Sequence, residues 1–252
     1  MLTKHSSKRP RILIGKDTRK SGDMLEAALT AGLCSMGAKV IPLGVVPTPA
    51  VAYLTRYYKA DAGVVISASH NPCEYNGIKF FNSDGYKLSD GIENEIESYI
   101  LGEKTIEELP THGKVGYVSA NHNAVEDYVA FAVSTIDCRL DGMKIAVDCA
   151  NGASYETAFK ALNKLGANVE AIHNTPDGVN INHMCGSTHM ESLQAYVTSI
   201  GADIGIAFDG DADRMLAVDE NGKLIDGDQI MAACAKFMRD NGTLKQNTLV
   251  AT

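Results

Sequence analysis

Two short polar segments carry the residues that could do chemistry in this chain. Ser69-His-Asn-Pro72 follows the apolar run Gly63–Ile66, and Asp209-Gly-Asp-Ala-Asp-Arg214 follows the apolar run Ile204–Phe208. The first segment offers a hydroxyl group and the second offers three carboxylates. We predict that the two segments meet around a divalent metal ion and that the Ser69 hydroxyl carries a phosphoryl group.

The three carboxylates belong to Asp209, Asp211 and Asp213, at every second position. In an extended strand, side chains on one face stand about 7 Å apart. Mg²⁺ holds its oxygen ligands at about 2.0–2.1 Å, so the segment must curl to bring all three to one ion. Gly210 and the small Ala212 permit that curl. Because three carboxylates exceed the charge of one divalent ion, water and a phosphate oxygen are expected in the remaining positions.

Three other interpretations of the acidic segment remain open. A hairpin turn at Asp209-Gly210 explains one aspartate but not the other two. A calcium-binding EF-hand loop would place Glu220 at the twelfth position, but Arg214 occupies the sixth, which requires glycine. A solvated acidic loop without a metal is the third interpretation.

Ser69 also has a structural interpretation, because Ser-His-Asn-Pro is favourable turn chemistry in itself. The chain has no Gly-x-Ser-x-Gly elbow at this serine, which disfavours an acyl-transfer hydrolase. His70 adjoins Ser69, and adjacent side chains of extended backbone point apart. We therefore expect His70 to orient or pack the loop rather than to act as a general base.

The overall composition narrows the classes of function. The chain has 252 residues, 45% hydrophobic and 21% charged, with a net charge of -8. This charge disfavours nucleic-acid or anionic-membrane partners, which require clustered Lys and Arg. Neither a membrane-spanning run nor a signal peptide is present in the sequence. Six widely spaced cysteines fit a reducing compartment, so we expect a cytoplasmic protein that binds a small, phosphorylated substrate.

Periodicity and turn signals predict an α/β protein. In the first half the expected strands are 11–15, 39–42 and 64–67, a hairpin joins 76–81 to 85–88, and helices occupy 21–36, 48–58, 92–100 and 124–135. In the second half the expected strands are 144–148, 204–208, 215–219 and 223–225, and 248–252 resembles the first strand of a third unit that is cut before it is completed. The expected helices end near 166, span 191–200 and span 228–238, and Lys164–Val169 matches Ser35–Val40, which leads into the second strand of the first half. Ser21 and Thr48 are expected to cap their helices.

The second half repeats the first. Ala202–Phe208 aligns with Asp61–Ile66, so both halves are predicted to be βαβαβ units. The serine and aspartate loops then occupy equivalent places at the carboxyl ends of equivalent strands, where open α/β sheets bind ligands. We expect two domains, 1–137 and 138–252, joined near Asp137–Gly142.

Six motifs together resemble the α-D-phosphohexomutases, most closely their bacterial glucosamine-phosphate branch. They are Gly15-Lys-Asp-Thr-Arg19-Lys-Ser-Gly22, Ile66-Ser-Ala-Ser69-His-Asn-Pro72, Asn76-Gly-Ile-Lys79-Phe-Phe81, Cys149-Ala-Asn-Gly-Ala153, Gly186-Ser-Thr-His189 and Asp209-Gly-Asp-Ala-Asp-Arg214. The similarity covers nearly the whole chain. It implies two similar three-layer α/β/α domains with mixed sheets.

The resemblance also implies a reaction. Ser69 would be a phosphoserine that interconverts glucosamine 6-phosphate and glucosamine 1-phosphate through a 1,6-bisphosphate, in amino-sugar nucleotide and cell-wall precursor synthesis. By the resemblance, Asp209, Asp211, Asp213 and the Ser69 phosphate would bind Mg²⁺. Arg19 would help to hold that phosphate, and Lys79 would transfer a proton or stabilise charge. His70, Asn71 and Arg214 would support the two loops. Two alternatives to these roles remain: Arg19 is an exposed cation of its loop, and Lys79 is an ordinary charge at the edge of a strand.

The chain departs from the family pattern in two ways. Ala212 stands where the family usually has glycine, and the family has four domains where this chain has two. The Phe-Gly-Thr motif of the first strand, the third-domain sugar loop and the fourth-domain phosphate loop are missing. We therefore expect a two-domain fragment with little or no isomerase activity, whose partners are the missing C-terminal domains, and a homodimer is compatible with the resemblance.

Other functions also fit the sequence. Within the family, the protein could be a phosphomannomutase or phosphoglucomutase. Outside it, the candidates are a metal-dependent sugar phosphatase and a non-catalytic sugar-phosphate binding protein. A phosphatase would release phosphate continuously, and a binding protein would not need Ser69.

Overall fold

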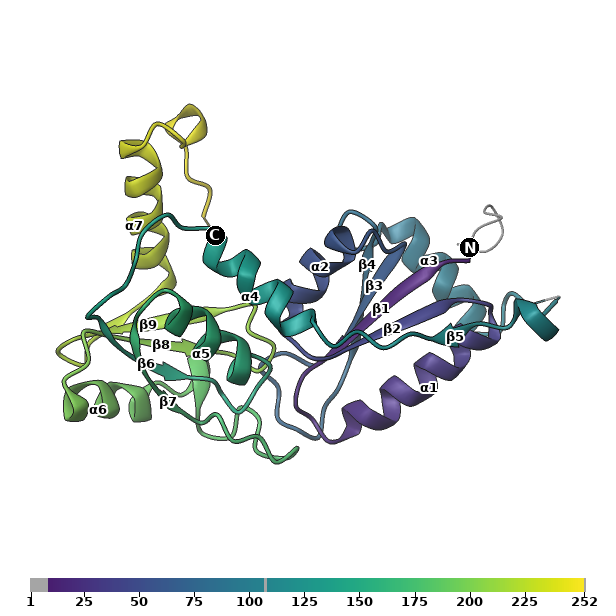
Figure 1. The fold of residues 1–252 in the computed structure, drawn as a ribbon, viewed down its shortest axis with the longest axis horizontal. Coiled ribbons are helices and arrows are strands. Elements are labelled where there is room, and N and C mark those ends of the chain that lie inside the picture. The colour runs from purple at the N-terminus through teal and green to yellow at the C-terminus, as the bar shows by residue number, and fades with distance from the viewer. Residues whose placement is uncertain (1–8, 107, 252) are drawn as a thin grey trace.

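The computed structural model describes residues 9–106 and 108–251, which form two α/β units placed end to end (Figure 1). The strands of the first unit are β1 (Arg11–Lys16), β2 (Lys39–Val45), β3 (Ala62–Ile66), β4 (Ile78–Asn82) and β5 (Tyr117–Val118). Its helices are α1 (Ser21–Ser35), α2 (Thr48–Tyr57), α3 (Asp90–Ile100), α4 (Ala124–Ser134) and the short 3₁₀ helix η1 (His112–Lys114).

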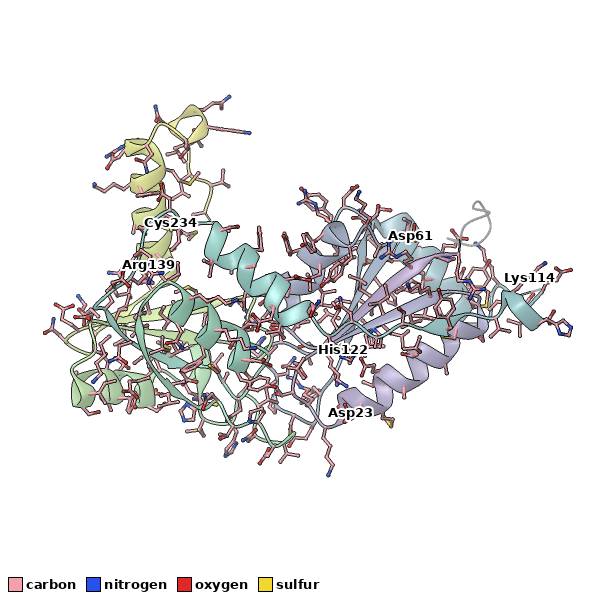
Figure 2. All side chains as sticks on the ribbon, viewed as in Figure 1. Asp23, Asp61, Lys114, His122, Arg139 and Cys234 are labelled. Atoms are coloured by element: carbon pink, nitrogen blue, oxygen red, sulfur yellow. The ribbon has the colours of Figure 1, made fainter. Side chains whose placement is uncertain are left out.

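The first sheet has the strand order β4-β3-β1-β2-β5. β1 runs parallel to β2 and β3, and β4 is antiparallel to β3. Asp61, directly before β3, lies at the end of the unit that is remote from the second unit (Figure 2). The carboxyl ends of the central strands therefore point toward the second unit.

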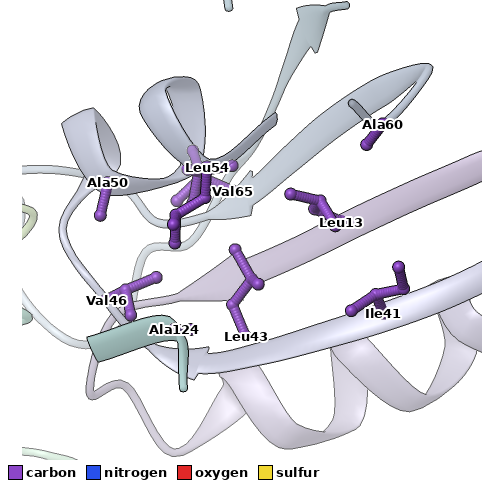
Figure 3. Packing of buried hydrophobic residues seen from close by; sticks show 10 residues of the cluster. Leu13, Ile41, Leu43, Val46, Ala50, Leu54, Ala60, Val65 and Ala124 are labelled. Atoms are coloured by element: carbon purple, nitrogen blue, oxygen red, sulfur yellow. The ribbon is translucent and has the colours of Figure 1, made fainter. Parts of the chain in front are cut away.

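Helices cover both faces of the first sheet because β1 is apolar on both sides, as expected of a central parallel strand. Ile12 and Ile14 belong to the core on the α1 side. Leu13 belongs to the core on the other side, where Val65 of β3 and Leu54 of α2 pack against it (Figure 3). The alternation of strand side chains thus divides the apolar residues between two helical layers.

The second unit repeats this arrangement. Its strands are β6 (Lys144–Asp148), β7 (Asn168–Ile172), β8 (Ile204–Phe208), β9 (Met215–Asp219) and β10 (Leu224–Ile225). Its helices are α5 (Ser154–Lys164), α6 (Glu191–Ile200), α7 (Gly227–Asp240) and the short 3₁₀ helices η2 (Gly186–Thr188) and η3 (Lys245–Asn247). The strand order of the second sheet is β10-β9-β8-β6-β7. Its strands β9-β8-β6-β7 correspond, in the same order, to β4-β3-β1-β2 of the first sheet, which confirms the predicted repeat and the mixed α/β fold.

Helix α4 packs against both α2 of the first unit and α5 of the second. Glu126 of α4 accepts hydrogen bonds from Lys160 and Lys164 of α5 at 2.6 and 2.8 Å. The connection between the units therefore includes a helix with contacts on either side. The division between residues 137 and 138 stays a prediction.

Both predicted helix caps were wrong by one residue. Lys20 is the N-cap of α1, and Ser21 is its first helical residue, whose hydroxyl accepts a hydrogen bond from Asn76 Nδ2 at 2.9 Å. Pro47 is the N-cap of α2, and the Thr48 hydroxyl instead donates a hydrogen bond to Asp211 of the second unit. In each case a tertiary hydrogen bond uses the side chain that local pattern assigned to capping.

Three further differences concern strands. β5 was not predicted, because a two-residue strand in a polar stretch carries no periodicity. Of the predicted hairpin, only the first strand, β4, forms as a strand. The second strand is replaced by a single antiparallel bridge between Phe81 and Lys87. The predicted strand 248–252 was wrong for the described residues 248–251, which are not paired with any described strand, and Thr252 lies outside the described residues. None of the helices in the described part of the chain is both long and apolar enough to cross a bilayer.

Candidate active site

The serine loop begins where β3 ends at Ile66. Ser67 is buried, and its Oγ donates to Asp17 Oδ2 at 2.5 Å and accepts from the Ser69 backbone N–H at 3.0 Å. Ser69 has φ of 52°, a left-handed conformation that is uncommon for serine and costs roughly 1–3 kcal/mol. The hydrogen bonds through Ser67 offset this strain and present the Ser69 hydroxyl beyond the end of the strand.

The aspartate loop occupies the equivalent place after β8. Asp209 and Asp211 are buried, whereas Asp213 is partly exposed. Ala212 has φ of 54°, so the curl expected from the sequence is present but places a non-glycine residue in the left-handed region. One carboxylate oxygen from each of the three aspartates lies within 4.8 Å of the others.

The two loops meet. Ser69 Oγ donates a hydrogen bond to Asp209 Oδ2 at 2.7 Å, although 140 residues separate them in the chain. The contact joins the carboxyl ends of two equivalent strands from two different sheets. The structure thus brings the predicted nucleophilic hydroxyl to the predicted metal ligands.

Two cationic side chains lie among these groups. Lys79 Nζ is 2.8 Å from Asp211 Oδ2 and 3.9 Å from Asp213 Oδ2. Arg214 Nη2 donates to Ser69 Oγ at 2.5 Å and to Asp209 Oδ2 at 2.8 Å. The same nitrogen lies 2.6 Å from Nδ1 of His70. Positive charge therefore lies beside both the hydroxyl and the carboxylates.

Arg19 lies beneath the serine loop rather than beside the hydroxyl. Its side chain is fully buried and forms an ion pair with Asp17. Its Nη2 donates to the backbone oxygens of Ser69 and Asn71 at 3.1 and 2.5 Å. The geometry gives Arg19 a supporting position, and direct contact between Arg19 and a phosphate stays a prediction. Asn71 enters these contacts through its carbonyl oxygen.

The surroundings shift the pKa values of two aspartates in opposite directions. Burial alone would raise the pKa of Asp211, but hydrogen bonds from Lys79 and Thr48 bring it below its usual value. Burial, followed by the charges of Asp211 and Asp209, raises the pKa of Asp213. The cluster therefore holds more negative charge than its neighbours neutralise, which is the condition that favours a bound cation.

The donor set fits a hard divalent ion. All three candidate ligands offer carboxylate oxygens, and the described residues provide no hydrogen-bond donor to the buried Asp211 Oδ1. A buried carboxylate oxygen without a donor is costly, and a metal ion would satisfy it. Asp209, Asp211 and Asp213 are thus the residues that could hold a metal.

A second group of candidate ligands has a structural explanation. Asp148, His173 and Cys185 offer ligand atoms within 4.8 Å of one another. Asp148 already accepts hydrogen bonds from the backbone N–H groups of Ala150 and Gly186, at 2.8 and 2.9 Å. Burial and the charge of Asp148 raise the pKa of Cys185 to about 12, so its thiol is protonated beside the hydrogen-bonded Asp148.

Sequence reasoning missed four residues of this site. Thr48 Oγ1 donates to Asp211 Oδ2 at 2.7 Å, and Asn182 Nδ2 donates to Ser69 O at 2.9 Å. Asp17 and Ser67 complete the buried support of the serine loop. Asp17 and Ser67 stood inside quoted motifs, and Thr48 was assigned to a cap. Local sequence gave no signal for Asn182.

Comparison with known proteins places the chain in a family. The phosphoglucomutase/phosphomannomutase α/β/α domain I family matches residues 1–107, and the domain II family matches residues 125–222. A protein named phosphoglucosamine mutase from Ruminiclostridium cellulolyticum is 61% identical over 250 residues, which cover 99% of this chain and 55% of the relative. One of the same name from Acetivibrio thermocellus is 60% identical over 252 residues, which cover 100% of this chain and 56% of that protein.

The solved structures agree. A phosphoglucomutase/phosphomannomutase family protein from Burkholderia thailandensis has a TM-score of 0.75 and 28% identity, over 92% of this chain and 51% of that one. The chain spans about half the length of the curated relatives that it matches. By both domain matches and by this structural similarity, the chain belongs to the phosphoglucomutase/phosphomannomutase family.

Proposed function

We propose that this chain carries the phosphoserine and metal-binding part of a phosphoglucosamine mutase. The observation that carries the proposal is the 2.7 Å hydrogen bond between Ser69 Oγ and Asp209 Oδ2, which places one hydroxyl against three clustered carboxylates. The glucosamine branch is supported by the relatives of that name, which are 60% and 61% identical to this chain. Phosphomannomutase or phosphoglucomutase activity is the alternative within the family.

The proposed chemistry is a reversible phosphoryl transfer at Ser69. The bond between phosphorus and Ser69 Oγ breaks as a hydroxyl oxygen of a hexosamine phosphate forms a bond to the same phosphorus. The hydroxyl proton ends on Ser69 Oγ, and the sugar becomes a 1,6-bisphosphate. In the return step, Ser69 Oγ takes the phosphoryl group from the other end of the sugar, so neither water nor free phosphate enters the balance.

The surrounding residues supply what such a transfer requires, which is alignment and positive charge on the equatorial oxygens. Arg214 Nη2, 2.5 Å from Ser69 Oγ, is placed to contact a phosphate on that oxygen. Lys79 is the candidate for proton transfer or charge stabilisation. Arg19 acts through the loop backbone that it holds, and His70 and Asn71 support the same loop.

The metal that we propose is Mg²⁺. Asp209, Asp211, Asp213 and an oxygen of the Ser69 phosphate would hold it, because oxygen ligands are the ones that this ion prefers. When bound, the ion would neutralise charge on the transferring phosphoryl group. All six cysteines are free thiols, which fits the reducing cytoplasm as the proposed location.

The test is phosphorylation of Ser69 in the chain itself. The protein is incubated with Mg²⁺ and glucosamine 1,6-bisphosphate, and its intact mass is measured. We expect the mass of one phosphoryl group to be added to the wild type and to the exposed control Ser83→Ala, but not to Ser69→Ala. Glucose and mannose bisphosphates test the sugar branch.

Two results would contradict the proposal. Continuous release of inorganic phosphate without a phosphorylated protein would indicate a phosphatase. Tight binding of the bisphosphate with no added mass, unchanged by Ser69→Ala, would indicate a sugar-phosphate binding protein.

A further inference from the structure

Asn182 reaches from the second unit into the serine loop of the first. It lies in the connection between β7 and η2, is 8% exposed, and its backbone N–H donates to Ala150 O at 2.9 Å. Its side-chain Nδ2 donates to the backbone oxygens of Ser69 and Asn71 at 2.9 and 3.0 Å. One amide group therefore binds both ends of the turn that presents the nucleophilic hydroxyl.

The same two oxygens also accept hydrogen bonds from Arg19 Nη2, which belongs to the first unit. The turn is thus held by one donor from its own unit and one from the other. The two donors differ in what their loss would do. Removing Arg19 leaves the buried Asp17 without its ion-pair partner, which destabilises the fold. Removing Asn182 leaves both oxygens with a donor, so the fold is largely retained.

Asn182 also touches the aspartate loop. A Cβ atom on Gly210 would lie 2.7 Å from Asn182 Nδ2 and 2.7 Å from Ser69 O, which is closer than real Cβ atoms come. The amide therefore fills a narrow slot between the two loops, and only glycine at position 210 leaves room for it. The backbone N–H of Ala153 donates a hydrogen bond to Gly210 O at 2.8 Å, which also holds Gly210 in place.

We propose that Asn182 is a positioning residue for phosphoryl transfer at Ser69, which sets the register between the serine loop and the aspartate loop across the two units. This inference rests on the proposed function. In-line transfer is sensitive to alignment, and a displacement of about 1 Å can slow a reaction by about 10²-fold. The amide is suited to the place because it donates to two carbonyls without adding charge beside three carboxylates.

The conformation of Asn182 makes a clean substitution available. Its φ is 57°, in the left-handed region that Asn and Asp both tolerate. Asn182→Asp therefore keeps the side-chain size and the backbone conformation but replaces a donor with a charged acceptor that repels both carbonyl oxygens. Because the charge also lies beside the aspartate loop, hydrogen exchange in the turn is the readout that identifies the loss of positioning. The matched control is Asn163→Asp, because the exposed Asn163 also donates to a backbone oxygen, that of Phe159 at 2.9 Å, but on the outer surface of α5.

The experiment measures two quantities in the wild type and in both variants. The first is the rate of Ser69 phosphorylation by glucosamine 1,6-bisphosphate with Mg²⁺, followed by intact mass. The second is hydrogen exchange of the backbone amides from Ser69 to Asn71. For Asn182→Asp we expect a rate about 10²-fold lower and faster exchange confined to this turn. For Asn163→Asp we expect neither change.

The two readouts separate the possible failures. An unchanged phosphorylation rate in Asn182→Asp, with the wild type active, would overturn the inference. Faster exchange across the whole molecule, with the loss of rate explained by unfolding, would overturn it as well. If the wild type accepts no phosphoryl group, the proposed function fails, and the exchange data then decide alone: unchanged exchange in the turn would show that Asn182 does not hold it.

Discussion

Thr48 is bonded twice to Asp211 across the junction of the two units. Its backbone N–H donates to Asp211 O at 2.9 Å, and its hydroxyl donates to Asp211 Oδ2 at 2.7 Å. The first residue of α2 thereby orients a buried carboxylate of the aspartate loop. The orientation of a proposed metal ligand in the second unit depends on the helix that follows β2 in the first.

This relationship predicts that Thr48→Val weakens metal binding. The substitution keeps the shape but removes the hydroxyl that helps to lower the pKa of Asp211. Loss of a partner that orients a metal ligand typically costs 10–100-fold in affinity, and we expect a loss of about 10-fold for Mg²⁺ by calorimetric titration. Thr198→Val on the exposed face of α6 is the control. An unchanged affinity in Thr48→Val would show that Asp211 does not need this hydrogen bond.

Breaking the ion pair between Asp17 and Arg19 is expected to lower the stability of the fold strongly. Both side chains are fully buried, and Arg19 also supports the serine loop. Asp17→Asn leaves the guanidinium buried without its countercharge, and we expect the free energy of unfolding in urea to fall by about 3–5 kcal/mol.

The chain offers a matched control at the same sequence spacing. Arg139 and Asp141 form an ion pair in which both side chains are exposed to solvent. Asp141→Asn should therefore leave the free energy of unfolding nearly unchanged. Equal effects of the two substitutions would contradict the view that burial makes the Asp17 pair important.

Sequence predicted the features of the fold that repeat. The apolar runs Gly63–Ile66 and Ile204–Phe208 predicted equivalent strands, and β3 and β8 do occupy the same place in the two sheet orders. Strand periodicity and the repeat are local properties of the chain, so they can be recognised without coordinates. From the equivalence of the strands it followed that the loops carrying Ser69 and Asp209 lie at corresponding edges.

Sequence could not predict the contacts that depend on how the two units face each other. Thr48 and Asn182 act through the opposite unit, and no local pattern specifies that orientation. The predicted strand 248–252 was wrong for the described residues 248–251 for a related reason, because an apolar run forms a strand only where another strand pairs with it. Arg19 was identified as a site residue, but its burial beneath the loop depends on Asp17, which the motif contained without a stated role.

Ala212 predicts a stabilising substitution. It has φ of 54°, where an L-residue with a Cβ atom is strained by roughly 1–2 kcal/mol. Glycine removes the strain but increases the entropy of the unfolded chain, which offsets roughly 0.5–1 kcal/mol. We expect Ala212→Gly to raise the free energy of unfolding by up to about 1 kcal/mol, measured by urea denaturation. A fall of that size would show that the loop relaxes around alanine without strain.

His173 predicts a dependence of stability on pH. Its Nδ1 lies 2.9 Å from Asp148 Oδ2, and this hydrogen bond raises the pKa of His173 above the value of about 6.5 expected in the unfolded chain. A raised pKa means that the folded state binds the proton more tightly. The stabilisation is therefore complete below about pH 6.5 and is lost as the pH rises through the pKa of the folded state.

His173→Asn tests this linkage, because asparagine tolerates the left-handed φ of 46° at this position but carries no titrating group. The difference in free energy of unfolding between wild type and His173→Asn should be largest below about pH 6.5 and should shrink toward alkaline pH. His112 also has a left-handed φ, of 50°, and is exposed, so His112→Asn controls for the backbone. A difference that stays constant with pH, or grows as the pH rises, would mean that the Asp148–His173 pair contributes no proton-linked stability, and Asp148 would then serve only the backbone N–H groups of its loops.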